Sequence, residues 1–95
     1  MSSARRRRLR AMAHALEPLV RIGRAGLSTG VVEAADQALL DHELIKVRFQ
    51  EFKAQRHEMA GLLARRLEAE LVGLVGHVAI LYRPHPDPDR RRIQP

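Results

Sequence analysis

The fold is decided in the stretch from Val20 to Gly30, which reads VRIGRAGLSTG. A short run with strand-type residues leads into two glycines, Gly23 and Gly26, and these lead into hydroxyl residues that suit the start of a helix. Glycine permits a backbone with positive φ and leaves no side chain between the main chain and a partner. The stretch therefore predicts a strand, a tight GxxG loop and then a helix.

The GxxG loop has two interpretations. A glycine-bounded loop at a strand-to-helix junction is how KH-type RNA modules clamp a sugar-phosphate backbone, and the amides at a helix N-terminus favour an anion. The tip residues Arg24 and Ala25 would bring a cation and a small side chain to such a contact. Short glycine-bounded turns are also common as purely structural turns, so the loop alone leaves both interpretations open.

Outward from this loop, the spacing of apolar residues predicts an alternation of helices and strands. The clearest strand places Ile45, Val47 and Phe49 on a core face. Lys46 and Arg48 then lie on the opposite face. The predicted elements are a helix that stops near residue 15 or 16, a strand at 19–22, a helix from about 30 to 43, a strand at 44–49, a helix at about 55–70 and strands at 72–75 and 78–82.

The order α-β-α-β-α-β-β predicts an α/β domain with a four-stranded mixed sheet that helices back on one face. Each β-α-β unit joins parallel strands, and a tight turn at Gly76-His77 makes the last two strands an antiparallel hairpin. The uncovered sheet face carries Lys46, Arg48 and Arg21. Residues 1–84 form the single predicted domain. Residues 85–95 are rich in proline and arginine and are predicted to be a flexible tail without regular structure.

Composition narrows the class of protein. The chain has 95 residues, 45% of them hydrophobic, which suits one folded core and is too apolar for a disordered chain. It has no cysteine, which excludes disulfides, cysteine-based zinc sites and thiol nucleophiles. No apolar run approaches the ~20 residues of a membrane span, and no signal-peptide stretch is visible. We expect a cytoplasmic protein without a membrane partner.

The net charge of +6 points to a polyanionic partner. One basic block near the start consists of Arg5, Arg6, Arg7, Arg8 and Arg10. A smaller block near the end consists of Arg90, Arg91 and Arg92. Basic termini on either side of a central region of mixed charge are common in proteins that wrap nucleic acid. The alternative is that both basic blocks are solubilising tails without a fixed partner. Arginines in the first turn of a helix also oppose its dipole, so we expect the first helix to fray.

No arrangement of residues predicts catalysis, a metal site or a cofactor. Two stretches begin like the zinc-protease motif HExxH, at His42 and His57, but Lys46 and Gly61 stand where the second histidine is required. The glycine loop has neither the GK[ST] of a Walker loop nor the GxGxxG of a dinucleotide site.

The low aromatic content of 3% also matters, because many RNA modules stack bases on aromatic side chains. Phe49 falls on the core face and Tyr82 on the last strand, which leaves Phe52 as the only candidate platform. We therefore expect backbone and shape contacts to structured RNA, with modest base readout.

Four segments resemble one family when taken together. They are Ala13-His14, the GxxG loop at 23–26, the run HELIKV at 42–47 and the ending LYRP at 81–84. In type, order and spacing they resemble the CRM domain, the chloroplast RNA splicing and ribosome maturation module, whose bacterial stand-alone form is the YhbY family. The resemblance covers residues 5–84. The third helix and the strand after it match only in pattern, and family loops often carry lysine where this chain has Arg24-Ala25.

The resemblance implies a mixed sheet backed by helices, similar to the C-terminal domain of bacterial translation initiation factor three. It also implies binding to precursors of the large ribosomal subunit in bacteria and to group II introns in plant organelles. We therefore expect a non-catalytic, monomeric RNA-binding protein that binds large-subunit ribosomal RNA and assists ribosome assembly. The alternative is a general nucleic-acid-binding or protein-interaction module in which the glycine loop is purely structural.

The residues expected to contact RNA belong to the loop, the uncovered sheet face and the basic N-terminus. They are Gly23, Arg24, Ala25, Gly26, Arg21, Lys46, Arg48, Arg5, Arg6, Arg7, Arg8 and Arg10.

Overall fold

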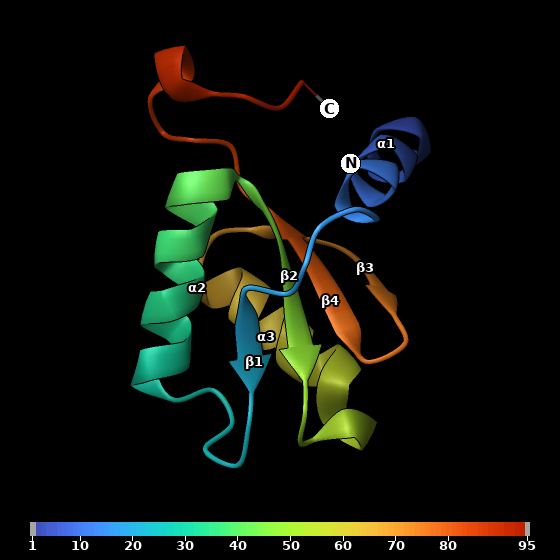
Figure 1. Ribbon diagram of the computed structural model, residues 1–95, viewed down its shortest axis with the longest axis vertical. Helices are drawn as coiled ribbons and strands as arrows, with labels where there is room; N and C mark the ends of the chain where they lie inside the picture. The colour runs from blue at the N-terminus through green and yellow to red at the C-terminus, as the bar shows by residue number, and fades with distance from the viewer. Residues whose placement is uncertain (1, 95) are drawn as a thin grey trace.

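The computed structural model describes residues 2–94, which form a four-stranded mixed sheet with helices packed on it (Figure 1). The strand order is β1-β2-β4-β3, with β1 parallel to β2 and with β4 antiparallel to both of its neighbours. The predicted α/β fold class is confirmed. In chain order the elements are α1 (Ser3–Ala13), β1 (Val20–Ile22), α2 (Thr29–His42), β2 (Leu44–Phe49), the 3-10 turn η1 (Lys53–Gln55), α3 (Arg56–Arg66), β3 (Glu70–Val75), β4 (Val78–Tyr82) and the 3-10 turn η2 (Pro88–Arg90).

The main core lies between one face of the sheet and the helices α2 and α3 (Figure 1). The alternation in β2 works as predicted, because Ile45, Val47 and Phe49 are all buried in this core. Leu39 of α2 and Leu63 of α3 pack against them from the helix side. None of the helices within residues 2–94 is long and apolar enough to cross a membrane.

A second, smaller core lies on the opposite face of the sheet, where α1 packs. Leu9 and Ala13 of α1 are buried there against Leu44, Ile80 and Tyr82. The sheet face predicted to be open is therefore covered at the α1 end. The sequence carries a signal for this, since the last strand reads VAILY, and an unbroken apolar run is typical of a strand buried on both faces.

Two helices end earlier than predicted. The first helix ends at Ala13, two to three residues before the predicted stop, and α3 ends at Arg66 instead of reaching residue 70. At the end of α3, Glu68 has a left-handed backbone with φ of 52°, and the amide of Ala69 donates to the carbonyl of Ala64 at 2.9 Å. This is a Schellman ending, which usually places glycine where Glu68 stands. Because no glycine stands there, the end of α3 has no local signal in the sequence.

The C-terminal segment lies over the end of the sheet where β2 begins and β4 ends (Figure 1). Its proline-rich stretch contains the turn η2, although the prolines were predicted to exclude regular structure there. Pro88 opens that turn, a position where proline's fixed φ is compatible with a helix, and the side chain of Asp87 accepts a hydrogen bond from the amide of Asp89 at 3.0 Å.

Candidate nucleic-acid interface

The GxxG loop forms a closed turn between β1 and α2, as the sequence predicts. The amide of Gly26 donates to the carbonyl oxygen of Gly23 at 3.0 Å, which leaves Arg24 and Ala25 exposed at the tip. Ser28 then caps α2, because its side-chain hydroxyl oxygen accepts a hydrogen bond from the amide of Val31, three residues later, at 3.2 Å. The loop thus presents a cationic tip directly before a capped helix.

The two glycines of the loop have different surroundings. Gly26 is buried at a φ of +63°, and a Cβ there would lie 3.5 Å from a ring carbon of Phe52 and 3.6 Å from the methyl group of Met59. Gly23 has no atom within 4 Å of the place where its Cβ would lie. The turn therefore requires glycine at Gly26 for its backbone, while Gly23 faces open space.

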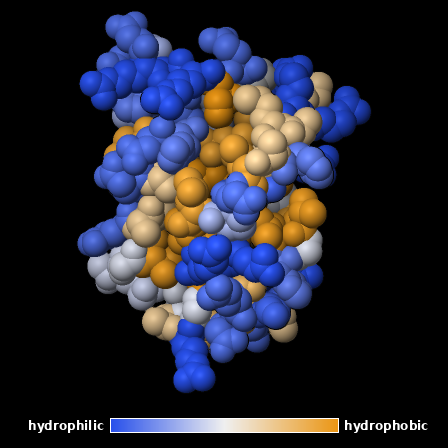
Figure 2. All heavy atoms as spheres, in the orientation of Figure 1, coloured by the Kyte–Doolittle hydropathy of each residue, from blue (hydrophilic) through white to orange (hydrophobic). Residues whose placement is uncertain are grey.

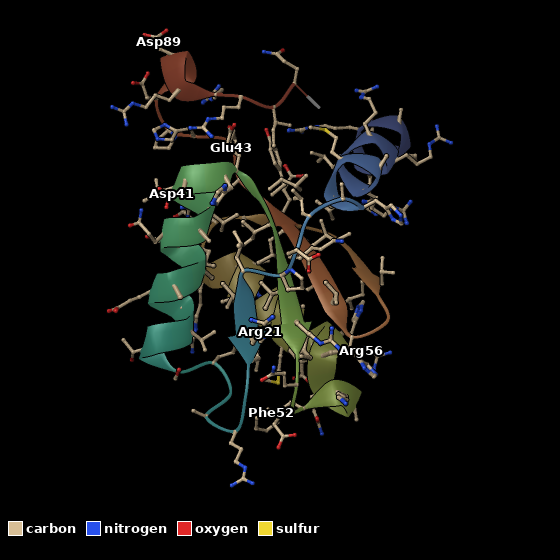
Figure 3. All side chains as sticks on the ribbon, viewed as in Figure 1. Arg21, Asp41, Glu43, Phe52, Arg56 and Asp89 are labelled. Atoms are coloured by element: carbon tan, nitrogen blue, oxygen red, sulfur yellow. The ribbon has the colours of Figure 1, made fainter. Side chains whose placement is uncertain are left out.

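Two arginines lie side by side on the sheet next to this loop. The parallel register of β1 and β2 makes Arg21 the direct partner of Arg48, and both side chains are exposed. They line a surface depression with Lys53 and His77. We call these four residues the basic sheet face. In Figure 3, Arg21 lies in front of the sheet, with Phe52 towards the loop end of the molecule.

The surface beside the basic sheet face is apolar. Figure 2 shows an apolar area on the same side of the molecule, surrounded by hydrophilic side chains. Among the residues that line a groove there, Met12, Leu16 and Leu19 are partly exposed at the end of α1 and in the following linker, and Ile93 of the C-terminal segment lies opposite them.

Lys46 is engaged with the end of α1. Its Nζ donates to the carbonyl oxygens of Leu16 at 3.0 Å and of His14 at 3.3 Å. A positive charge at the carbonyl end of a helix interacts favourably with the helix dipole. Of the two cations predicted on this strand face, Arg48 is therefore exposed, whereas Lys46 is half-buried and joins α1 to the sheet.

The N-terminal arginines also divide into two kinds. Arg5 is half-buried, with its guanidinium 5.5 Å from the ring centre of Tyr82 and 3.7 Å from a carboxylate oxygen of Glu70. The remaining four are exposed along α1, at the end of the molecule away from the GxxG loop (Figure 1). They are Arg6, Arg7, Arg8 and Arg10.

The predicted RNA-contacting residues extend from the loop end of the molecule to α1. Arg21 and Arg48 line one surface depression on the sheet, and Arg48 lines a second one with Lys46 and with Arg10 of α1. Within residues 2–94, none of the three ion pairs of the structure engages Arg21, Arg24 or Arg48.

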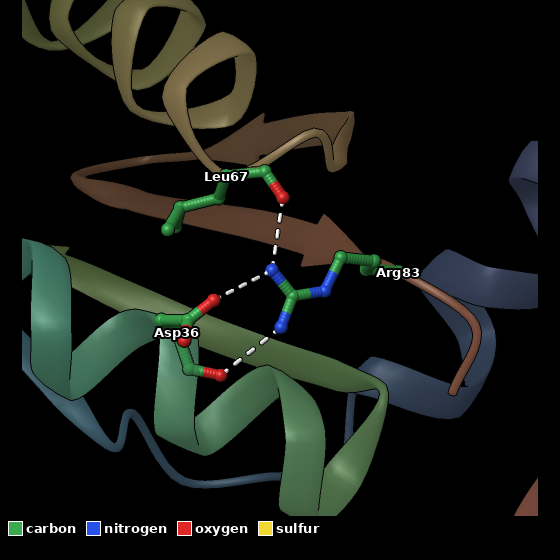
Figure 4. A network of polar contacts seen from close by, with 3 residues as sticks. All are labelled: Asp36, Leu67 and Arg83. Atoms are coloured by element: carbon green, nitrogen blue, oxygen red, sulfur yellow. Dashed lines mark hydrogen bonds and ion pairs between the residues drawn. The ribbon is translucent and has the colours of Figure 1, made fainter. Parts of the chain in front are cut away.

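Sequence reasoning missed the role of Arg83, in the LYRP ending. Its guanidinium donates to the carboxylate of Asp36 at 2.8 Å and to the carbonyl oxygens of Leu67 at 2.9 Å and Asp36 at 3.1 Å (Figure 4). These contacts join the end of β4 to α2 and to the end of α3. The sequence offers one signal for this role, which is that Arg83 directly follows the apolar strand that ends at Tyr82.

Glu43 was missed as well, although it lies in the HELIKV run. Its carboxylate is buried and accepts three backbone hydrogen bonds from the C-terminal segment: from Arg92 at 2.6 Å, from His85 at 2.8 Å and from Ile93 at 3.2 Å. Burial by itself raises the pKa of Glu43, but these amides and the nearby charge of His85 outweigh it. The pKa therefore lies below its usual value. Glu43 holds the C-terminal segment on the domain.

No metal centre is visible in the part of the chain that the structure describes. Within residues 2–94, no three side chains of the histidine, cysteine, aspartate or glutamate type are grouped so that they could hold a metal ion.

Residues 1–83 match the CRS1/YhbY (CRM) domain, and the chain belongs to this family. It is 42% identical over 82 residues to a probable RNA-binding protein of Methanocaldococcus jannaschii, a match that covers 83% of this chain and 60% of the archaeal protein. The chain thus spans less than two thirds of that relative. It is 34% identical over 85 residues to an RNA-binding protein of Haemophilus influenzae, which covers 88% of this chain and 86% of the relative.

A solved structure has the same fold. The solution structure of a hypothetical protein of Staphylococcus aureus, described as a candidate RNA-binding protein, superposes with a TM-score of 0.81 at 27% sequence identity and covers 99% of both chains. The likeness to the C-terminal domain of translation initiation factor three stays a prediction.

Proposed function

We propose that this chain is a non-catalytic RNA-binding protein that holds RNA through its GxxG loop and its basic sheet face. The observation that carries the proposal is the exposed Arg21–Arg48 pair, which the parallel register of β1 and β2 creates, on the strand that leads directly into the loop with the exposed Arg24. Exposed cations that lack an ion-pair partner in the described chain are available to phosphates. Family membership and the names of the relatives support RNA as the polyanion.

The residues proposed to touch RNA act mainly on its backbone. Phosphate contacts fix the position of a protein on RNA without reading bases, and arginine suits them because its planar guanidinium can donate two hydrogen bonds at once. The exposed arginines of α1 extend the contact, and Arg10 lines a depression with Arg48. Arg5 and Lys46 support it by holding α1 in place, and Gly23, Ala25 and Gly26 by keeping the loop narrow.

The proposed target is the RNA of large ribosomal subunit precursors, bound by a monomer in the cytoplasm during ribosome assembly. Sedimentation of a cell extract, with detection of this protein across the ribosomal fractions, tests this target. We expect the protein in the fractions of large-subunit precursors and not in those of mature ribosomes. Its absence from every ribosomal fraction would contradict the proposed target.

Affinity measurements separate RNA binding from a general attraction to polyanions. We expect purified protein to bind structured ribosomal RNA fragments more tightly than duplex DNA of equal length at the same salt concentration. Equal affinities would favour a general nucleic-acid-binding module. No binding to either would favour a protein-interaction module with a structural glycine loop.

A further inference from the structure

Within residues 2–94, Phe52 is the only phenylalanine, tyrosine or tryptophan whose ring is accessible. The sequence contains three aromatic residues, and the other two, Phe49 and Tyr82, are buried in the two cores. Phe52 is 40% exposed and belongs to neither core.

The ring of Phe52 lies against the GxxG loop. Two of its ring carbons are 3.5 and 3.8 Å from the place where a Cβ on Gly26 would lie. Because Gly26 has no side chain, the ring comes close to the backbone of the loop. Figure 3 shows Phe52 at the loop end of the molecule, beyond the end of β2.

The backbone of Phe52 is held in an unfavourable conformation. Its φ of 57° is left-handed, which is costly for a bulky residue and persists only where the surroundings enforce it. Its carbonyl oxygen accepts a hydrogen bond from the amide of Gln55 at 3.0 Å, which closes the turn η1. This backbone conformation therefore holds the ring beside the loop while leaving it partly exposed to solvent.

Two exposed cations lie on the segments that meet at this ring, while the exposed Glu51 precedes it. Lys53 follows it directly, and Arg24 lies at the tip of the loop that the ring contacts. An aromatic ring next to a cationic groove is the arrangement by which proteins hold unpaired nucleotides, with the phosphate on the cations and the base stacked on the ring.

We propose that Phe52 stacks on an unpaired base of the RNA whose backbone the GxxG loop holds. The inference rests on the proposed RNA binding and deepens it, because it makes the ligand at this end a single-stranded nucleotide in a loop or bulge. Stacking tolerates every base, so the site selects unpaired RNA without selecting a sequence. It also neutralises no phosphate and therefore adds nothing to the salt dependence of binding.

The experiment compares two RNAs of equal length, a hairpin with an unpaired loop and a fully paired duplex, with the wild type and two variants. F52L keeps an apolar side chain beside Gly26 but loses the flat ring, while F52Y keeps the ring. We expect F52L to bind the hairpin about fivefold or more weakly, with an unchanged slope of log K against log salt, and to bind the duplex as the wild type does. F52Y should bind both RNAs like the wild type.

A third variant reports on stacking directly. The chain has no tryptophan, so F52W introduces a single fluorescent reporter at this position. We expect the hairpin to quench its emission through base stacking and the duplex to leave it unchanged, a readout that holds even where F52L folds poorly.

The proposal is overturned if F52L binds the hairpin like the wild type, if it loses affinity for both RNAs equally, or if saturating hairpin leaves F52W emission unchanged. A wild type that binds neither RNA would overturn RNA binding itself. A wild type that binds both, and is weakened by R24Q but not by F52L, would overturn only the role of Phe52.

Discussion

Glu43 connects the sheet to the C-terminal segment through hydrogen bonds of its side chain. Its carboxylate is the shared acceptor for three backbone amides, and no side-chain cation is bonded to it in the described chain. We expect E43A to lower the free energy of unfolding by about 1–3 kcal/mol, since three amides lose their acceptor. E43Q keeps one carbonyl oxygen and should cost less. Urea denaturation measures both, and an E43A variant within about 0.5 kcal/mol of the wild type would contradict this role.

The lowered pKa of Glu43 also predicts how stability depends on pH. A carboxyl group whose pKa is lower in the folded state stabilises the fold above its unfolded pKa, which is about 4.3 for glutamate, and loses this contribution as the pH falls through its folded pKa. Between pH 6 and pH 3, the stability of the wild type should therefore fall more steeply than that of E43Q. Parallel profiles in thermal melts at several pH values would show that Glu43 does not titrate in this way.

Arg83 makes two of its three contacts with backbone carbonyls, so the loss of the Asp36 carboxylate should cost less stability than the loss of Arg83 itself. D36A removes one carboxylate that is half exposed, and we expect it to cost less than about 1 kcal/mol, because solvent screens that ion pair. R83M leaves the carbonyl of Leu67 without its donor and should cost about 1–3 kcal/mol. Urea denaturation of both variants measures the two losses of stability. A larger loss in D36A than in R83M would contradict this prediction.

The strand β2 carries two cations, of which Arg48 is exposed to solvent and Lys46 holds the end of α1. R48A should leave the free energy of unfolding within about 0.5 kcal/mol of the wild type, because that side chain is exposed. K46A should cost about 0.5–1.5 kcal/mol, because two carbonyls at the end of α1 lose their donor. Thermal melts of the two single variants test this difference. Equal losses would mean that Lys46 does not hold α1.

The helix α1 carries its exposed arginines at a cost to its own stability. Cations near a helix N-terminus oppose the dipole, and Arg6, Arg7 and Arg8 crowd like charges into the first turns. Changing these three to glutamine should leave the free protein as stable as before or slightly more stable at low salt. RNA binding should weaken for unrelated structured RNAs alike, since up to three phosphate contacts are lost.

Melts and salt titrations against two unrelated RNAs test this prediction. Unaltered affinity would make the arginines a solubilising feature, and a loss for only one RNA would show that they read something specific. R5Q serves as the comparison, because Arg5 contacts Tyr82 and Glu70 and its loss should lower stability.

Local patterns in the sequence predict the strands better than the turns. The alternation of β2 and the apolar run of β4 give the bounds of both strands correctly, because each pattern reports burial residue by residue. The turns at Glu43, Phe52 and Glu68 are left-handed without a glycine, so the sequence holds no local signal for them. This is why the end of α3 and the anchoring of the C-terminal segment could not be predicted.

The sequence predicts which residue types form the candidate site, but it does not predict which of these cations face solvent and which hold the fold. A basic residue on a strand face indicates a surface, and Arg21 and Arg48 are exposed as that pattern indicates. Lys46 and Arg5 have the same chemistry, yet their partners come from distant elements, such as the carbonyls after α1 and the ring of Tyr82. Only the tertiary structure separates cations that face solvent from cations that hold the fold.

The proposed binding surface places RNA on the loop end of the molecule and on the basic sheet face. The chain offers a matched control, because Arg65 and Arg66 are exposed on α3, which covers the opposite side of the sheet (Figure 1). R21Q/R48Q and R65Q/R66Q remove the same net charge from different faces. A general electrostatic attraction would respond equally to both variants, whereas a defined interface would respond to one.

The most direct test is therefore the equilibrium affinity of the wild type and these two variants for one structured ribosomal RNA fragment across a range of salt concentrations. We expect R21Q/R48Q to bind more weakly, with the slope of log K against log salt reduced by about 1 to 2, and R65Q/R66Q to bind like the wild type. Equal losses in the two variants, or a larger loss in R65Q/R66Q, would contradict the interface proposed for this protein.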